Sequence, residues 1–515
     1  MPQTNDKTWL DWMSWRQTAG LLVALTIPYV IALWWAEYPV MQDLYGHVES
    51  AWQWQALVSG DALATRLYRL QSLPWPNSLG PILAGALSPW IGSFAAVKLV
   101  LSLYLLAWPL AVLWLARELG RSPLVALLAL PTLIDVNWAS GFYNYLIAKP
   151  IALLALGMAL RWARRGRWQD GLLLAASLWL LFVGHALLWL YGMMGAALAI
   201  VALSEGRDRL TRLWPLALAV PVAGNYLVAS LGGGAMEGAW TWSTPDYALR
   251  ELWLHLGQLS RLSQEELVWA GAAVLLIVYL RLPRASEPVP EAGASTAAGS
   301  ANPEGATRVL QAWAMSFGLL FVFGPLHLPD VFSLCVRQAV FVVVFLVLMP
   351  RPRILQRRQI MGLLVIAGVG VAAHAGAMIY QYQGFSEQEM AGFSALIDEI
   401  PPGKRLYVHY TSSGTRYGDH QSAWHWPKMV AVTRAGVSND SFAYRSTNYV
   451  TLTEAGTRLR SARSKKLNAD TLREHWDYLL LRASNASKTE RSIRRYTTKI
   501  GRAQSWHLYR INPAL

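Results

Sequence analysis

Long apolar runs recur along the chain, and most of its charged residues lie in the segments between them. A bilayer core about 30 Å thick needs roughly 20 helical residues, and about 17 suffice when flanking side chains snorkel. The pattern therefore predicts a polytopic α-helical membrane protein with about eleven transmembrane helices plus interfacial helices. We expect the crossings at residues 19–35, 97–116, 123–136, 143–162, 171–187, 188–204, 213–231, 266–281, 308–324, 332–350 and 359–380.

Two places depart from a simple alternation of helix and loop. Residues 36–77 follow the first run as a long polar segment, and residues 78–94 are apolar but broken by two prolines and a glycine. We expect 36–77 to form the first external loop and 78–94 to form a dipping or interfacial helix. The run at 171–203 must fit two crossings between basic flanks, which predicts short helices that meet near Gly184 and His185.

Composition agrees with a membrane protein. With 54% hydrophobic residues, 15% charged residues and a mean hydropathy of +0.27, the chain has more apolar surface than one soluble core would use. The formal net charge of +14 does not indicate nucleic acid, because the basic residues cluster in short loops, as the positive-inside rule predicts. The single cysteine excludes an intramolecular disulfide and a multi-cysteine metal site. The basic clusters are Arg117 with Arg121, 164–167, 207–212, Arg281 with Arg284, and 351–358.

These basic loops, placed in the cytoplasm, orient the chain. Lys7 and Arg16 keep residues 1–18 inside, so the first run is predicted to be an uncleaved signal anchor. Residues 285–307 are rich in Ala, Pro, Gly, Ser and Glu, which predicts a disordered cytoplasmic linker. Residues 232–265 are expected to form an external loop.

The end of the chain differs from the rest, because charges become frequent and long apolar runs disappear. After a membrane domain at 19–380, residues 381–515 are predicted to form a small extracytoplasmic α/β domain. A helical segment is followed by a turn and by alternating residues at 405–410, which are typical of a strand. Two further strands are expected at 477–482 and 506–511, with basic helices between them.

An acid and a histidine stand where the chain is expected to emerge from its first crossing. Asp43 and His47 are four residues apart and share one helix face, which Ser50 and Trp54 continue. An aspartate there can act as a base at the boundary between a lipid donor and an aqueous acceptor. The structural alternative is that Asp43 caps the helix and His47 is an interfacial polar residue.

Polar residues also gather at the predicted outward ends of other helices, whereas the interiors of the spans are almost free of charge. Ionisable groups near the bilayer are costly and are by default functional candidates. Their shared depth predicts one external polar cavity, in which Lys149 and Arg337 would receive an anion such as phosphate. Structural alternatives are that Lys149 snorkels, Arg337 pairs with Asp330, and His185 satisfies a helix turn. The candidates are Asp135, Tyr143, Asn144, Lys149, His185 and Arg337.

One segment near the C-terminus is dense in possible metal ligands. His409, Asp419, His420 and His425 lie close together in the sequence. Their spacing is a weak signal, and histidines of a surface loop are the simpler interpretation, although a divalent cation is left open. We predict no metal site and no cofactor.

Together these features resemble the GT-C superfamily of integral membrane glycosyltransferases, in the style of bacterial relatives of protein mannosyltransferases and lipid A aminoarabinose transferases. The cues are DLYGH at 43–47, GFYNYLIAKPIALLALGMAL at 141–160, the Arg337 segment entering a late helix, and the external C-terminal domain. Many members carry two adjacent acids in the first loop. Here leucine follows Asp43, and Glu49 and Asp135 are the candidates for the second acid.

The resemblance implies an inverting glycosyltransferase of a bacterial cytoplasmic (inner) membrane. It would move a sugar from a polyprenyl-phosphate donor to an extracytoplasmic glycolipid, glycan or protein, with Asp43 as general base and His47 and Asp135 beside it. The residues implied to bind the lipid phosphate or donor are Lys149, His185, Arg337, Tyr143 and Asn144. A lipid-linked polysaccharide ligase or polymerase, a polytopic transporter and a non-catalytic scaffold are the alternatives.

Overall fold

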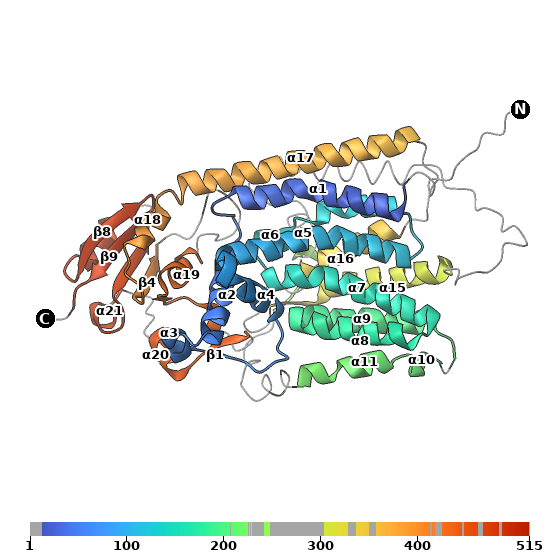
Figure 1. Cartoon of the computed structure of the whole chain (residues 1–515), viewed down its shortest axis with the longest axis horizontal. Helices are drawn as coiled ribbons and strands as arrows, with labels where there is room; N and C mark the ends of the chain where they lie inside the picture. The colour runs from blue at the N-terminus through green and yellow to red at the C-terminus, as the bar shows by residue number, and fades with distance from the viewer. Residues whose placement is uncertain are drawn as a thin grey trace, which may run out of the picture.

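The protein, seen in a computed structural model, consists of long helices that run side by side and a β-sheet beyond one end of them (Figure 1). The described residues are 13–206, 208–224, 226, 228, 241–247, 303–327, 336–349, 357–411, 415, 417, 425–444, 448–461, 467–483 and 487–513. The span expected at 266–281 lies outside them, as do most of the linker and most of the loop expected at 232–265.

Six helices in the described ranges are long and apolar enough to cross a membrane, and the chain is an integral membrane protein. They are α1 (Trp15–Trp35), α5 (Ser93–Glu118), α7 (Tyr143–Arg165), α9 (Ala186–Leu203), α15 (Pro303–Phe323) and α17 (Arg357–Gln388). Shorter apolar elements are α4 (Leu79–Ile91), η2 (Pro123–Thr132), α8 (Trp168–Gly184) and α16 (Ala339–Leu348). The estimate of about eleven crossings includes segments that are shorter here or lie outside the described ranges.

Helix breaks occur where the sequence predicts them. α4 and α5 are separated at Gly92, whose φ of +77° favours glycine. α8 and α9 meet at His185, which has an extended backbone. The remaining short elements of the membrane part are α6 (Val136–Ala139), α10 (Asp208–Thr211), α11 (Trp214–Ala219), η3 (Pro221–Ala223), β2 (Thr241–Trp242), β3 (Pro325–His327) and η4 (Val336–Gln338).

The crossing predicted at 123–136 is wrong, because this segment is not a long α-helix. Its ten residues Pro123–Thr132 form the 3-10 helix η2, with one proline at its start and Pro131 inside. A 3-10 helix rises about 2 Å per residue, so η2 spans only about 20 Å. Almost all of it is buried in protein, where such irregular backbone is tolerated at membrane depth.

Two predicted boundaries also move. α15 begins at Pro303, so the last five residues of the linker predicted at 285–307 belong to this helix. α17 continues to Gln388, past the expected start of the C-terminal domain at residue 381. The extra turns of α17 keep a buried face, since Tyr382 and Phe385 are almost fully buried there.

Side-chain contacts join the described basic segments at the C-terminal ends of α5 and α7 and at α10, which lies at the end of the bundle away from the sheet (Figure 1). Arg161, near the C-terminal end of α7, pairs with Glu118 at the end of α5. The neighbouring indole of Trp162 donates a hydrogen bond to the carbonyl of Arg212 at 2.8 Å. This clustering of cations at one end agrees with the positive-inside pattern of the sequence.

The C-terminal region contains a five-stranded sheet in the order β5-β4-β7-β9-β8. Its strands are β4 (Arg405–Tyr410), β5 (Val437–Ser438), β7 (Tyr478–Arg482), β8 (Thr497–Ala503) and β9 (Trp506–Ile511). β4 pairs in parallel with β5 and β7, whereas β9 is antiparallel to β7 and β8. The helical elements are α18 (Phe393–Asp398), η5 (Trp426–Lys428), α19 (Met429–Arg434), η6 (Phe442–Tyr444), α20 (Glu454–Ser461), α21 (Ala469–His475) and α22 (Ser487–Ile493). The three strands expected from alternation are all present.

The segment after the first helix packs against this C-terminal region. It forms α2 (Leu44–Val58), α3 (Ala62–Leu67) and β1 (Tyr68–Leu70), all at the sheet end of the molecule (Figure 1). β1 pairs antiparallel with β6 (Val450–Leu452), although the two strands lie far apart in sequence. The segment bearing Asp43 is thereby joined directly to the C-terminal region.

Candidate active site

Asp43 is held by its backbone at the start of α2. Its amide donates a hydrogen bond to the carbonyl of Ser140 at 3.0 Å, and the amide of Gln42 donates to Ala139 at 3.1 Å. Gly141 has a φ of +68°, and a Cβ there would lie 2.9 Å from the Asp43 nitrogen, so glycine permits this approach. Asp43 occupies the N-cap position, but its side chain makes no capping hydrogen bond.

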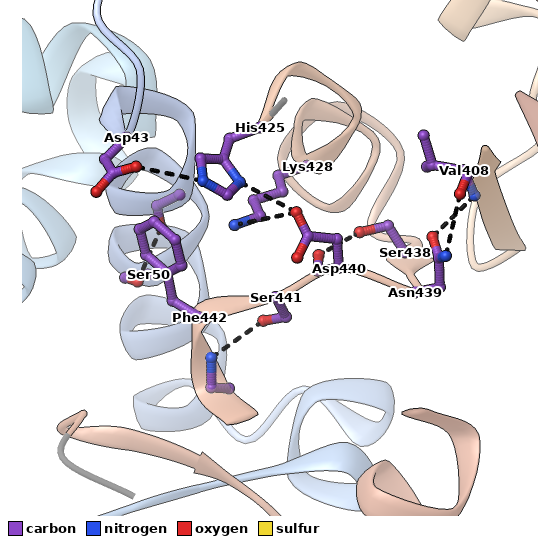
Figure 2. Close-up of polar contacts among 12 residues, drawn as sticks. Asp43, Ser50, Val408, His425, Lys428, Ser438, Asn439, Asp440, Ser441 and Phe442 are labelled. Carbon is purple, nitrogen blue, oxygen red and sulfur yellow. Dashed lines mark hydrogen bonds and ion pairs between the residues drawn. The ribbon is translucent and has the colours of Figure 1, made fainter. Parts of the chain in front are cut away.

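The carboxylate of Asp43 instead meets a histidine from the C-terminal region (Figure 2). Asp43 Oδ1 lies 3.3 Å from His425 Nε2, and His425 Nδ1 lies 3.0 Å from Asp440 Oδ2. Lys428 Nζ is 3.6 Å from the same oxygen of Asp440. Lys428 is fully buried, whereas Asp43 keeps 15% of its side-chain surface exposed. Of this group Asp43 is therefore the member best placed to meet a substrate.

A second acid of α2 lies behind this group. Glu49 is completely buried, and neither carboxyl oxygen has a hydrogen-bond partner among the described residues. Burial raises the pKa of Glu49 to about 8; nearby Lys428 opposes the rise and Asp440 adds to it. A buried acid with a pKa this high carries a proton at neutral pH, unlike a carboxylate ready to accept one.

Asp135 and Lys149 form a buried ion pair. Lys149 Nζ lies 3.0 Å from Asp135 Oδ2 and also donates to the hydroxyl of Tyr104 at 3.0 Å. Asp135 caps α6 by accepting a hydrogen bond from the Trp138 amide, and it accepts a second from the Asn137 side chain. Lys149 does not snorkel, since its side chain has no exposed surface. Its charge is balanced within the protein.

Arg337 and His185 form a separate group. Arg337 Nη1 lies 3.5 Å from His185 Nε2, and the guanidinium lies 3.8 Å from the ring centre of Phe142. The hydroxyl of Tyr145 donates a hydrogen bond to the Arg337 carbonyl at 2.6 Å. The alternative partner of Arg337, Asp330, lies outside the described residues. An arginine braced on an aromatic face is pre-organised to bind an anion.

The other predicted residues line the region between these groups. The ring of His47 lies 5.2 Å from that of Tyr143 and 5.4 Å from that of Phe442. Tyr143 and Asn144 both face Gly80 of α4, where a Cβ would lie 2.5 Å from each side chain. These residues join the first loop, α4 and the start of α7 by close packing.

Residues 135–145 connect all the groups. This short segment supplies Asp135 to the buried ion pair and carbonyl oxygens of α6 to the Asp43 backbone. It also supplies Phe142 beneath Arg337 and Tyr143 beside His47. Five of the predicted site residues therefore belong to three contact groups along this segment, and His47, Tyr143 and Asn144 pack beside them.

Sequence reasoning missed the partners of Asp43. Asp440 and Lys428 drew no attention, and His425 was noticed only as one of several clustered histidines. Asp419 and His420 lie outside the described residues, and within those ranges no group of three His, Cys, Asp or Glu side chains could hold a metal. The only signal for Asp440 is a polar turn directly after the short strand β5.

Comparison with solved structures identifies the fold. The chain matches the crystal structure of ArnT from Cupriavidus metallidurans bound to undecaprenyl phosphate, with a TM-score of 0.54 and 13% identity over 98% of both chains. It matches the apo structure of that protein with a TM-score of 0.51 and 12% identity, over 95% of this chain and 97% of the other. The chain has the GT-C fold.

The GT-C fold is recognised here from structure alone. No family model matches the sequence, and no curated protein matches it. A cryo-EM structure of the arabinofuranosyltransferase AftD from Mycobacteria is also similar, with a TM-score of 0.48 and 14% identity over 98% of this chain and 40% of that one.

Proposed function

We propose that this protein is an inverting glycosyltransferase that moves a sugar from a polyprenyl-phosphate donor to an acceptor outside the cytoplasm. The observation that carries the proposal is the placement of Asp43, which is partly exposed and fixed on both sides by Ser140 and His425. The full-length likeness to ArnT, solved with undecaprenyl phosphate, supports a lipid-linked donor. Outside the cytoplasm nucleotide sugars are not expected, so a lipid carrier is the natural source of sugar.

In the proposed reaction the oxygen of an acceptor hydroxyl attacks the anomeric carbon of the sugar, while Asp43 accepts the proton of that hydroxyl. The bond between that carbon and the phosphate oxygen breaks on the opposite face, and the electron pair leaves with the lipid phosphate. One displacement inverts the anomeric configuration, through a transition state with oxocarbenium character. The products are the glycosylated acceptor and polyprenyl phosphate.

Arg337 is proposed to bind the lipid phosphate as its charge develops, with His185 beside it. Lys149 has a different part in this proposal, because Asp135 already balances its charge. The ion pair of Lys149 and Asp135 fixes the segment that carries Phe142 and Tyr143. These residues support the donor site by packing, together with His47 and Asn144.

The proposed orientation follows from the charge pattern. The basic end of the bundle faces the cytoplasm, and the end bearing Asp43 and the sheet faces outward. We infer a bacterial inner membrane, in which the acceptor is a glycolipid, a glycan or a protein on the outer side. The lipid donor then reaches Asp43 and Arg337 from the outer leaflet.

The proposal is tested by mass spectrometry of extracted glycolipids and envelope glycans from cells with the wild-type chain, without it, or with Asp43→Asn. Asp61→Asn is the matched control, since Asp61 caps α3 in the same loop and asparagine preserves a cap. We expect one glycan to lose a sugar-sized mass in the null and Asp43→Asn cells, and to keep it in the control.

If Asp43→Asn cells resemble the wild type while null cells differ, Asp43 is not the base. A transporter or a scaffold then describes the protein better than a transferase does. The same result would leave the ligase or polymerase alternative standing, because that chemistry does not require the acid after the first helix.

A further inference from the structure

The most informative contact lies between the N-terminal end of α2 and the C-terminal region. Asp43, His425 and Asp440 form a continuous line of polar atoms, with spacings of 3.3 Å and 3.0 Å (Figure 2). The exposed fraction of their side chains falls from 15% at Asp43 to 11% at His425 and 10% at Asp440. The partly exposed end of the line is therefore the proposed base.

We propose that His425, aimed by Asp440, is a positioning residue that holds Asp43 for catalysis, so that the C-terminal region completes the active site. This inference rests on the proposed function and adds to it. Neither residue needs to touch the substrate, because both act through the carboxylate of Asp43.

The hydrogen-bonding chemistry of the three groups supports this role. An ionised carboxylate can only accept hydrogen bonds, and each ring nitrogen of His425 faces a carboxyl oxygen. His425 Nδ1 is hydrogen-bonded to Asp440 Oδ2 at 3.0 Å, and His425 Nε2 lies 3.3 Å from Asp43 Oδ1, so the imidazole bridges the two carboxyl groups. His425 thereby holds the Asp43 carboxylate at Oδ1, and Asp43 is the group proposed to accept the proton of the acceptor hydroxyl.

Asp440 is itself fixed to the sheet. The neighbouring Asn439 accepts a hydrogen bond from the Val408 amide at 2.8 Å and donates one to the Val408 carbonyl at 3.1 Å. Ser438 donates to the backbone carbonyl of Asp440 at 2.6 Å. Strand β4 therefore holds the turn that carries Asp440, and this rigidity reaches Asp43 through His425 (Figure 2).

The surrounding groups keep this line ordered. Lys428 places its ammonium 3.6 Å from Asp440 Oδ2 and 3.7 Å from the ring centre of Phe442. The same phenyl ring meets His425 edge-on, with ring centres 4.9 Å apart.

Two substitutions separate positioning from simple structural support. In His425→Gln the amide nitrogen can occupy the place of Nε2 and donate to Asp43, while the contact to Asp440 is lost. In His425→Asn the shorter amide can replace Nδ1 and donate to Asp440, while the contact to Asp43 is lost. The two variants remove one hydrogen bond each, so they are matched in their expected effect on folding.

The assay uses full-length protein purified in detergent. Lipid extract and membranes from cells that lack the chain supply the unidentified donor and acceptor. The readout is the initial rate at which polyprenyl phosphate is released, at saturating and at limiting extract. We expect His425→Asn to lower the initial rate at saturating extract by about 100-fold, a loss that displacement of a catalytic group by about 1 Å can cause. The amount of extract that gives half the maximal rate should stay within about twofold of the wild type.

His425→Gln should keep most of the wild-type rate, and His475→Gln, on the exposed helix α21, should keep all of it. Equal losses in the Gln and Asn variants would overturn the inference, as would a loss confined to limiting extract. Thermal unfolding of both His425 variants checks that they are equally folded. If Asp43→Asn abolishes release while His425→Asn does not, only this inference fails. If Asp43→Asn retains release, the proposed function itself fails.

Discussion

At the scale of single residues, two buried acids of the described ranges are held in different ways. Asp135 and Lys149 neutralise each other inside the bundle, whereas Glu49 is buried without a hydrogen-bond partner in the described ranges. A buried pair is strongly destabilised when one partner is removed, because the other charge is left uncompensated. A buried acid whose loss of hydration outweighs the effect of a nearby cation takes up a proton instead. The two arrangements therefore predict opposite responses to substitution.

Glu49→Gln should change how stability depends on pH. Because burial raises the pKa of Glu49 to about 8, the folded state binds the proton more tightly than the unfolded chain does. The resulting stability is complete below the unfolded pKa and is lost as pH rises through about 8. We expect Glu49→Gln to match the wild type at pH 5 and to be more stable at pH 9, by roughly 2 to 4 kcal/mol.

The measurement is thermal unfolding of both purified proteins in one detergent at pH 5 and pH 9. Glu454→Gln is the control, because Glu454 is an exposed acid on α20. If the unfolding temperatures of the wild type and of Glu49→Gln change equally between pH 5 and pH 9, Glu49 is not protonated in the folded protein.

Lys149→Ala should destabilise the protein by about 3 to 5 kcal/mol, because Asp135 would remain buried without its cation. Adding Asp135→Asn to that variant should restore much of the stability, since the uncompensated charge is removed. Chemical denaturation of the three variants measures the effect. If Lys149→Ala loses activity with unchanged stability, Lys149 acts on the donor directly.

At the scale of elements, the turn between α6 and α7 fixes the geometry of the site. The carbonyl oxygens of Ala139 and Ser140 hold the backbone of Gln42 and Asp43, and Gly141 permits the contact. Phe142 then braces Arg337. The proposed base and the proposed phosphate ligand are thus separated by one rigid turn.

Gly141→Ala is predicted to lower activity by about 100-fold, because its Cβ would push the Asp43 amide away by a fraction of an ångström or more. Gly60→Ala is the matched control, since Gly60 has a similar φ of +73° but no atom within 4 Å of the added Cβ. Both changes carry a similar backbone strain, so Gly60→Ala shows how much of any loss comes from that strain alone. Equal activities of the two variants would contradict the clamp on Asp43.

The sequence anticipated some of this arrangement and not the rest, for a physical reason. Asp43, His185 and Arg337 could be selected because their depth relative to apolar runs is a one-dimensional property. The helix break at His185 and the strand at 405–410 also follow from local patterns. The pairing of Asp43 with His425, and of Asp135 with Lys149, depends on packing between elements, which hydropathy does not encode.

At the scale of the whole molecule, the fold joins the segment after α1 to the C-terminal region around one site. α17 carries the chain beyond the bundle, and the ion pair of Glu389 and Arg482, at 3.0 Å, ties its end to strand β7. The pairing of β1 with β6 closes the same junction from the other side. The length of η2 was not predictable by apolar length alone, because its prolines shorten a segment that hydropathy counts as a span.

The proposed orientation predicts which surfaces can be labelled from outside the cell. In a Cys335→Ser background, His475→Cys on α21 should react with a membrane-impermeant thiol reagent in intact cells. Asp208→Cys on α10, at the basic end, should react only after the membrane is permeabilised. The reverse labelling pattern would show that the chain has the opposite orientation, with Asp43 on the cytoplasmic side.

The most direct test of the account measures polyprenyl phosphate released by the purified full-length protein from lipid extract of cells that lack the chain. The wild type should release it together with a glycosylated product of opposite anomeric configuration to the donor. Asp43→Asn should have the same unfolding temperature as the wild type and should release polyprenyl phosphate at least about 100-fold more slowly. Release by Asp43→Asn at the wild-type rate, or a product that retains the donor configuration, would contradict the assignment of Asp43 as the base of an inverting transfer.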